Sequence, residues 1–448
     1  MYLDMKVAII CPPEKHHFKP LKLLAQAFLK KGADIIMACG YHFRDEVEQA
    51  GITYYPLNCH NQHAPSGENG SGKRRHGLNG AQRLLRNSKK GVIRLLETQI
   101  EQWHAQLSVD PKGLHAQISQ LRLTENPDFW IVEQHSFNVS LVLHTLDETF
   151  VTFCNGDPST IPAKRELFGV PHRWPKVLAQ DKKTIKALRY EARELCKKVT
   201  RHFNRFIRVT APLQPSVENA FRFTSEEAVI YNYPNFGSEI SYEVEAQRLF
   251  CGTFIEKAPL SDPWKSTLKA HKKAAPRILI SFGELWSART DVVKTCVQVI
   301  SRKYPESLII IDANGFSYEY NDFRNERILV EDFIPESALL PHIDIYIHNG
   351  ACEPFREALY YEKPMLVFPF SVGELNIGWD VSVHEVGEVL DPNNFSEEAL
   401  LGKVARLLNP DNHWELHYWG QRMKQTDAVN VVEQLSIFNQ RSKKCHSA

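Results

Sequence analysis

The part of the sequence richest in chemistry runs from an apolar strand through a turn into a helix. Residues 343–359 deliver His348 at the carboxyl end of the strand, and Asn349-Gly350 forms the turn. Pro354 fits the first position of the helix. The start of that helix presents unpaired backbone N–H groups and attracts an anion. His348 could therefore donate a hydrogen bond to a diphosphate, and Glu357 could accept from ribose hydroxyls.

Two further strand ends precede this segment. Arg277-Ile-Leu-Ile-Ser-Phe-Gly283 ends in a Ser-x-Gly turn, which lets a ligand approach the backbone. Val330-Glu-Asp-Phe-Ile-Pro335 ends another strand and is followed by Leu339-Leu340-Pro341.

In this order the three segments resemble the donor-binding region of glycosyltransferase family 1, which includes UDP-glycosyltransferases and macrolide glycosyltransferases. The resemblance covers about residues 277–390 and includes Lys363-Pro364-Met365-Leu366-Val367-Phe368-Pro369. It implies the GT-B architecture, in which two Rossmann-like, doubly wound α/β lobes enclose a cleft. The donor-binding residues that it implies are Ser281, Gly283, Val330, Phe333, His348, Asn349, Gly350, Glu357 and Glu374.

Two of the departures of the donor segment from the family pattern bear directly on its binding residues. His348 and Glu357 are one residue further apart than in the family, so either His348 or Asn349 could face the phosphates. Gly373-Glu374 replaces the Asp-Gln pair that grips the sugar. Glu374 could still accept from two hydroxyls, but the donor sugar is left open.

The resemblance also places a base in the N-terminal half. His17-Phe-Lys-Pro20 has the spacing of the family's first loop, with His16 one residue out of register. An imidazole with a reference pKa of about 6.5 can take the proton of an attacking hydroxyl, typically a 10²- to 10⁴-fold effect. Residues 126–133 resemble the family segment that carries the partner carboxylate, so Glu133 is the candidate, ahead of Asp128.

The function implied is inverting transfer of a sugar from a UDP- or dTDP-sugar to an acceptor hydroxyl. The chain contains no Asp-x-Asp, so we expect no metal and no other cofactor. The alternatives are a nucleotide-sugar epimerase, which would need only the donor, and an inactive binding partner of another transferase.

These residues need two alternating series of strands and helices to position them. In the first half we expect strands at Lys6–Cys11, Asp34–Ala38, Ile52–Leu57, Asp128–Glu133, Phe150–Phe153 and Phe206–Thr210, and helices at 21–31, 44–50, 80–106 and 178–204. In the second half we expect strands at Arg277–Ser281, Leu308–Asp312, Ile328–Val330, Ile343–His348 and Pro364–Phe368, and helices at 291–303, 354–362, 375–385 and 397–408. The expected domains are an acceptor lobe (1–255), a linker (256–276) and a donor lobe (277–448), whose last helix (about 412–440) could pack back on the first lobe.

Composition narrows the class of protein. A chain of 448 residues, 43% hydrophobic and 24% charged, suits two globular lobes. The nine scattered cysteines include no Cys-x-x-Cys pair, which favours a cytoplasmic protein. The sequence contains no run of about 18 apolar residues, which is the length that a membrane-spanning helix needs. Residues 67–73 resemble a phosphate-binding P-loop, but Arg74 stands where that motif needs a Ser or Thr. We therefore expect a polar loop near 60–79.

Charge is divided unevenly between the halves. Residues 1–250 carry 33 Lys and Arg against 26 Asp and Glu, whereas residues 251–448 carry 21 against 27. Two basic stretches, 73–94 and 182–208, lie in the acceptor half. They are either solvated helix faces or a surface that touches an anionic membrane or an anionic acceptor. We expect no nucleic-acid partner.

Overall fold

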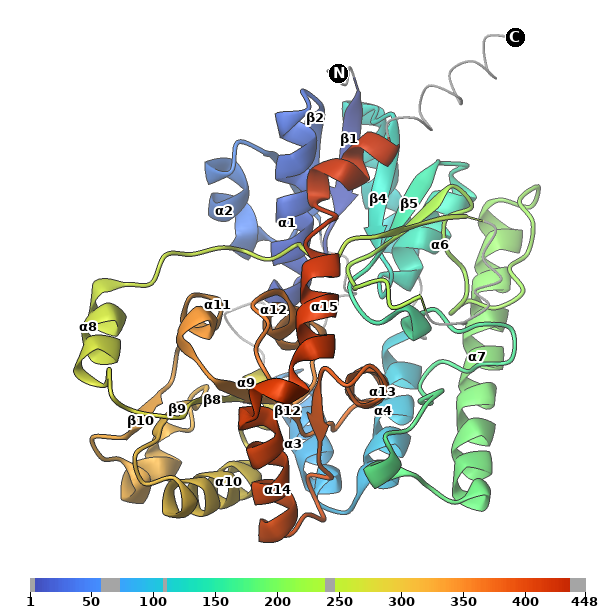
Figure 1. Cartoon of the computed structure of the whole chain (residues 1–448). Coiled ribbons are helices and arrows are strands. Elements are labelled where there is room, and N and C mark those ends of the chain that lie inside the picture. Colours follow the sequence, from blue (N-terminus) through green and yellow to red (C-terminus); the bar gives the residue numbers. More distant parts are fainter. Residues whose placement is uncertain (1–4, 58–72, 108–110, 238–245, 436–448) are drawn as a thin grey trace.

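The computed structural model describes residues 5–57, 73–107, 111–237 and 246–435, and the side chains of residues 73–79, 105 and 106 lie outside that description. The chain forms two α/β lobes, with the N-terminal lobe at the top of Figure 1 and the C-terminal lobe below. Residues 67–72 of the P-loop-like segment lie outside the described residues.

The N-terminal lobe is built on a seven-stranded parallel sheet in the order β3-β2-β1-β4-β5-β6-β7. Its strands are β1 (Lys6–Ile10), β2 (Asp34–Cys39), β3 (Thr53–Pro56), β4 (Phe129–Glu133), β5 (Phe150–Cys154), β6 (Ala228–Tyr231) and β7 (Gln247–Phe250). Its helices are α1 (Lys15–Lys30), α2 (Arg44–Gln49), α3 (Lys73–Ser88), α4 (Val92–Leu107), α5 (Lys112–Glu125), α6 (Phe137–Thr145) and α7 (Lys182–Thr210).

The C-terminal lobe repeats the plan with a six-stranded parallel sheet in the order β10-β9-β8-β11-β12-β13. Its strands are β8 (Arg277–Ser281), β9 (Leu308–Asp312), β10 (Ile328–Glu331), β11 (Ile345–His348), β12 (Met365–Val367) and β13 (Gly387–Val389). Its helices, with α8 leading in from the linker, are α8 (Asp262–Ala270), α9 (Gly283–Trp286), α10 (Thr290–Lys303), α11 (Glu336–Leu339), α12 (Cys352–Tyr360), α13 (Val372–Val383), α14 (Glu397–Leu408) and α15 (Trp414–Met423).

Both sheets are doubly wound, so each reverses its winding between two central strands. The reversal falls between β1 and β4 in the first lobe and between β8 and β11 in the second. Ligands of such sheets bind outside the carboxyl ends of the strands at this point. His17 follows β1 and Glu133 is the last residue of β4. In the second lobe, Ser281 ends β8 and His348 ends β11.

Expectations for two helices of the first lobe differ from the structure. Phe206–Thr210 is the last turn and a half of α7 and not a strand, because Val199, Phe203 and Phe206 continue the buried stripe of that helix. The first helix begins at Lys15 and not Leu21, which places His17 in its first turn. Helix α8 lies within residues 256–276, the range expected to be the linker.

Helix α4 packs on the first lobe through Leu96 and Ile100, and together with α3 it also contacts the second lobe. Leu95 of α4 belongs to the apolar core around β8, β9 and β11, with Leu84 and Leu85 of α3 packed against it. Arg289 is only 1% exposed and places Nη1 3.5 Å from the carbonyl oxygen of Ser88. Leu84 and Leu85 are therefore partly covered by the second lobe.

The end of the chain crosses in the opposite direction. Helix α15 rises from the C-terminal lobe, and the segment that follows lies against the N-terminal lobe in Figure 1. Val431, Val432 and Leu435 are at most 3% exposed and belong to the same core cluster as the strands β1 and β2.

Candidate active site between the two lobes

A proline inside helix α1 fixes the surroundings of His17. Pro20 has no N–H, so the carbonyl of His16 four residues earlier lacks its helical partner. Asn155, just beyond the end of β5, fills this position by donating from Nδ2 to the His16 carbonyl at 2.8 Å. The same Nδ2 lies 3.5 Å from Nδ1 of His17. Helix α1 and the end of β5 are thereby held together beside His17.

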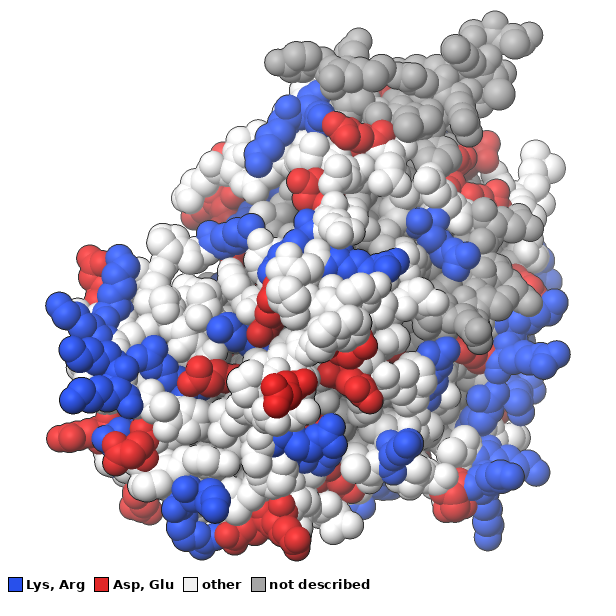
Figure 2. All heavy atoms as spheres, in the orientation of Figure 1, with Lys and Arg blue, Asp and Glu red and all other residues white. Residues whose placement is uncertain are grey.

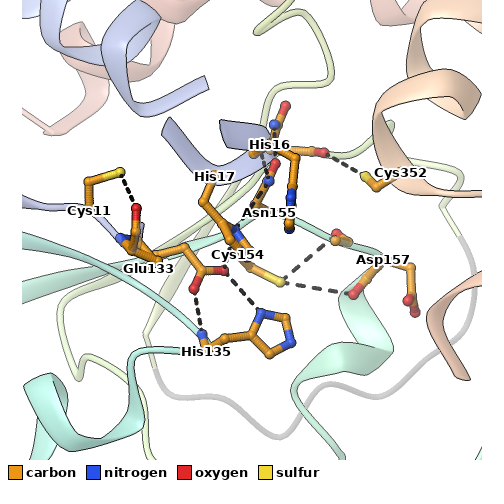
Figure 3. A network of polar contacts seen from close by, with 12 residues as sticks. Cys11, His16, His17, Glu133, His135, Cys154, Asn155, Asp157 and Cys352 are labelled. Atoms are coloured by element: carbon orange, nitrogen blue, oxygen red, sulfur yellow. Dashed lines mark hydrogen bonds and ion pairs between the residues drawn. The ribbon is translucent and has the colours of Figure 1, made fainter. Parts of the chain in front are cut away.

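The predicted base and carboxylate lie next to each other (Figure 3). Nδ1 of His17 is 3.3 Å from Oε1 of Glu133, which is fully buried at the end of β4. The expected pairing of His17 with Glu133 is thus present in the structure. Asp128, the second choice, lies at the other end of β4, where Oδ2 accepts from the backbone N–H of Lys6 at 2.7 Å.

A second histidine, which the sequence did not indicate, shares Glu133. Nδ1 of His135 lies 3.1 Å from Oε1 of Glu133, and the His135 backbone N–H donates to Oε2 at 2.7 Å. Burial raises the pKa of Glu133, but the two imidazoles and these bonds more than offset it and hold the pKa at about 2. Glu133 therefore remains an anion throughout the neutral range.

His135 responds in the opposite direction to the same contact. Burial lowers the pKa of His135, but the Glu133 carboxylate outweighs burial and raises it above the usual value. Its ring stacks near Trp103, with centroids 5.9 Å apart. Within the described residues, His17, Glu133 and His135 also form a group whose possible metal-ligand atoms lie within 4.8 Å of one another.

On the C-terminal side, His348 is fully buried at the end of β11. Its Nδ1 accepts the backbone N–H of Gly350 at 3.0 Å, so the ring hydrogen must sit on Nε2. Nε2 is buried and has no hydrogen-bond partner among the described residues. Burial lowers the pKa of His348 to about 3, which keeps the ring neutral. The Nε2–H group of His348 is therefore a hydrogen-bond donor without an acceptor among the described residues.

The turn after His348 is tightly specified. Gly350 has φ +83°, and a Cβ there would lie 2.6 Å from Cγ1 of Val367. Helix α12 begins at Cys352 with Ala351 as its N-cap, two residues earlier than expected from Pro354. Pro354 still lies in the first turn, where its missing N–H breaks no helical bond.

Glu357 is buried within α12, 6% exposed. Burial and then the nearby Glu353 raise its pKa to about 7, although Lys19 opposes the shift. Nζ of Lys19 reaches across from α1 to Oε1 of Glu353 at 2.8 Å. Helix α1, which carries His17, and helix α12 therefore meet at the boundary between the lobes.

Glu374 is already fully engaged by the protein. Oε1 accepts from Asn349 Nδ2 at 2.6 Å and from Trp286 Nε1 at 3.0 Å. Oε2 accepts the backbone N–H groups of Phe370 and Ser371 at 2.7 and 2.8 Å. In this conformation Glu374 caps helix α13 and fixes Asn349, and neither carboxylate oxygen is open to a sugar.

The remaining predicted donor residues fall into different surroundings. Ser281 donates from Oγ to Oε1 of Glu336 at 2.8 Å, beneath the strand ends. Val330 is a core residue, 1% exposed, so only its backbone could meet a ligand. Phe333 is 80% exposed beyond β10. Gly283 has φ +66° at the start of α9, and among the described residues no atom lies within 4 Å of where a Cβ would stand.

No family model matches the chain. Demethyllactenocin mycarosyltransferase from Streptomyces fradiae is 24% identical over 162 residues, covering 36% of this chain and 34% of that protein. 4'-Demethylrebeccamycin synthase from Lentzea aerocolonigenes is 24% identical over 195 residues, covering 42% of this chain and 44% of that protein. The chain thus matches less than half the length of these curated relatives.

Solved structures match over nearly the whole chain. The glycotransferase of kitacinnamycin superposes with a TM-score of 0.68 at 12% identity, covering 97% of this chain and 98% of the other. The glycosyltransferase VinC in complex with dTDP gives 0.64 at 14% identity, covering 98% and 100%. The chain has the GT-B fold. The resemblance to glycosyltransferase family 1 is also confirmed, because the curated relatives are glycosyltransferases.

The site of this GT-B protein was only partly visible in its sequence. His135 and Asn155 were missed, although both lie within two residues of the carboxyl end of a predicted strand. Since β1, β4 and β5 are neighbours, their carboxyl ends converge, and polar residues there could have been considered together.

Proposed function

We propose that this GT-B protein is an inverting glycosyltransferase, which moves a sugar from a UDP- or dTDP-sugar to an acceptor hydroxyl. The observation that carries the proposal is the pairing of His17 with the anionic, fully buried Glu133 at the lobe boundary. Curated relatives are named for glycosyl transfer, and the solved structures of VinC and of a spinosyn rhamnosyltransferase contain thymidine diphosphate.

The proposed chemistry follows from the two sides of the boundary. With Nδ1–H of His17 directed at Glu133, Nε2 is the atom that takes the acceptor proton as the hydroxyl attacks the anomeric carbon. The bond to the diphosphate breaks as the new glycosidic bond forms, and a single displacement inverts that carbon. The start of α12 and Nε2–H of His348 would stabilise the departing diphosphate.

A direct test combines nucleotide binding with product analysis. A thermal-shift series should show stabilisation by UDP or dTDP, because a ligand that binds only the folded state raises stability by mass action. The anomeric proton coupling of the product should show inversion relative to the donor. A new nucleotide sugar formed from donor alone would indicate an epimerase, and absence of any nucleotide effect would indicate an inactive partner.

We predict that turnover survives excess EDTA. The diphosphate charge would be met by N–H groups, so no step needs a divalent cation. Initial rates should agree within about twofold with and without EDTA at roughly 5–10 mM, which is far above the concentration of trace metal. Loss of activity with EDTA and its recovery with manganese would contradict the prediction.

The proposal extends to a peripheral contact between helix α7 and an anionic membrane. Arg193, Lys197, Arg201 and Arg205 follow one another at four-residue spacing, and all four are exposed. Lys and Arg side chains gather along the edge of the molecule that α7 occupies (Figure 2). Leu213, 99% exposed just beyond α7, adds an apolar residue that could insert between headgroups.

The other basic stretch, 73–94, supports this contact less well. Its apolar residues Leu84 and Leu85 are partly buried against the second lobe, which leaves less apolar surface for a bilayer. Among the described residues, no helix combines the length and the apolar content needed to cross a membrane. Contact through α7 would therefore rest on surface charge.

We predict that the protein co-sediments with vesicles of 30% phosphatidylserine at low salt, since each basic residue contributes about 1 kcal/mol near an anionic surface. Salt at a few hundred millimolar should release it because the Debye length falls below about 8 Å. Replacing Arg193, Arg201 and Arg205 by glutamine should abolish binding. The matched control replaces the exposed Lys269, Lys272 and Lys273 near α8. Binding indifferent to salt, lipid charge and the α7 changes would contradict the contact.

A further inference from the structure

A cavity of about 330 Å³ lies between the lobes, lined by residues of both. The N-terminal lobe contributes residues that follow β5 and β6, and the C-terminal lobe contributes one face of α13. The residues that matter most are Asp157, Ser159, Tyr233, Asn376, Trp379 and Asp380. This volume is at the lower end of the roughly 300–1,000 Å³ of ligand sites, so it suits a single small ring and not a bulky polycyclic body.

The cavity is connected to the proposed base by two asparagines. Asn155, which contacts His17, accepts from Nδ2 of Asn232 at 2.7 Å. Asp157 comes two residues after Asn155, and Tyr233 comes directly after Asn232, and both line the cavity. Figure 3 shows Asn155 beside His17, with Asp157 further along the same segment. A molecule in the cavity would therefore lie close to the site of proton transfer.

Contacts between the lobes form the walls of the cavity. The Tyr233 hydroxyl donates to Oδ2 of Asp380 at 2.7 Å. Nδ2 of Asn376 donates to Oγ of Ser159 at 2.7 Å. The Arg173 guanidinium lies 4.2 Å from the ring centroid of Trp379. Each of these contacts joins the N-terminal lobe to α13, so the shape of the cavity depends on how the two lobes are placed relative to each other.

The polar groups of the cavity are rich in hydrogen-bond acceptors. Oδ1 of Asn376, a residue only 7% exposed, is buried and has no partner among the described residues. Burial raises the pKa of Asp157 to about 6, against two hydrogen bonds from Ser159. Burial raises the pKa of Asp380 to about 7. The hydrogen bond from Tyr233 lowers this pKa, whereas the nearby Asp157 carboxylate raises it further. These carboxyl groups can accept or donate hydrogen bonds near neutral pH.

We propose that this cavity binds the acceptor through a sugar ring, so that the acceptor of the reaction is a saccharide or carries one. The inference rests on the proposed function. Hydroxyl groups of a sugar both donate and accept, which matches Asn376 Oδ1 and the two carboxyl groups. The aromatic rings of Trp379, Phe236 and Phe250, which all line the cavity, offer apolar surface to the C–H groups of such a ring.

An apolar acceptor would fit the same walls poorly. It would leave buried polar atoms without partners, and each unsatisfied group costs about 1–3 kcal/mol. A site built to bind hydroxyl groups therefore rejects an analogue without them much more strongly than an apolar pocket rejects an extra hydroxyl. Acceptors whose only hydroxyl lies on an apolar body should accordingly be used poorly.

The test uses p-nitrophenyl glycosides of common hexoses and sugar-free 4-nitrobenzyl alcohol as acceptors, with UDP-glucose and dTDP-glucose as donors. Nucleoside-diphosphate release is measured with and without acceptor, and saturation-transfer NMR measures binding of each glycoside. The variants are Asp380→Leu, Asp380→Asn and the control Asp262→Asn, whose carboxylate on α8 is 91% exposed.

We expect glycosides, and not the alcohol, to stimulate nucleotide release. Asp380→Leu should raise the KM for the glycoside about tenfold or more, with Asp380→Asn closer to the parent. The KM for the donor should be unchanged in every variant, and Asp262→Asn should match the parent throughout.

Equal use of the sugar-free alcohol, no binding of any glycoside, an unchanged acceptor KM in Asp380→Leu, or a change confined to the donor KM would each overturn the inference. Nucleotide binding by the parent protein tests the proposed function separately. Its absence would overturn that function, and the inference about the cavity with it.

Discussion

Replacement of His17 by alanine is expected to lower turnover by about 10²- to 10⁴-fold while nucleotide affinity stays within about twofold of the parent. The proposed base acts only as the acceptor proton is transferred, and it belongs to the lobe opposite the diphosphate. Turnover measured under saturating donor and acceptor, with nucleotide affinity from titration calorimetry, separates the two effects.

His16 provides the matched control. Its ring neighbours that of His17, with centroids 4.2 Å apart, but Asn155 bonds to its backbone carbonyl, which alanine retains. His16→Ala should therefore keep most of the activity and the fold. Equal turnover of His17→Ala and the parent would remove the proposed mechanism.

Replacement of His348 by alanine is expected to weaken nucleoside-diphosphate binding about tenfold to a hundredfold. Its buried Nε2–H has no partner among the described residues, and a hydrogen bond to a charged oxygen is worth about 1.5–3 kcal/mol. Glu357→Gln should weaken nucleotide binding through the ribose hydroxyls in the same assay.

Because His348 is fully buried, its loss could also disturb packing, so the melting temperature should be recorded for each variant without nucleotide. The control is His342→Ala, at an exposed position just before β11. Unchanged affinity in folded His348→Ala and Glu357→Gln would show that the nucleotide binds elsewhere.

Much of the second lobe could be predicted from local sequence. Continuous apolar runs such as Leu308–Asp312 are typical of strands that a parallel sheet buries on both faces, and the structure places a strand there. The start of α12 was misjudged by two residues because Ala351 has no capping side chain that would have marked it. Pro354 is compatible with more than one position in the first turn.

The parts of the site that escaped prediction depend on contacts between distant segments. His135 reaches Glu133 through a turn whose course the sequence does not specify, and Asn155 bonds to the carbonyl of His16, which lies 139 residues earlier. The role of Glu374 was equally hidden, because its four donors come from α9, the turn after β11 and the start of its own helix.

At the end of α7, residue composition and helical periodicity predict different secondary structures. Phe206-Ile-Arg-Val-Thr210 has the β-branched and aromatic composition of a strand, but Phe203, Phe206 and Ile207 extend the buried stripe of a 29-residue helix. Packing of that stripe outweighs local propensity. Strands β6 and β7 are four residues each, too short to give a clear alternation of polar and apolar side chains.

The return of the chain end to the first lobe has a consequence for engineering. A fragment ending at the linker would lack Val431, Val432 and Leu435, and its core would be left with an apolar hollow open to water. Chimaeras that exchange donor lobes between GT-B enzymes at a single junction near residue 256 would pair this lobe with a foreign tail. A graft with a second junction beyond Met423, which restores residues 424–435 to their own lobe, should give soluble hybrids where the single-junction graft aggregates.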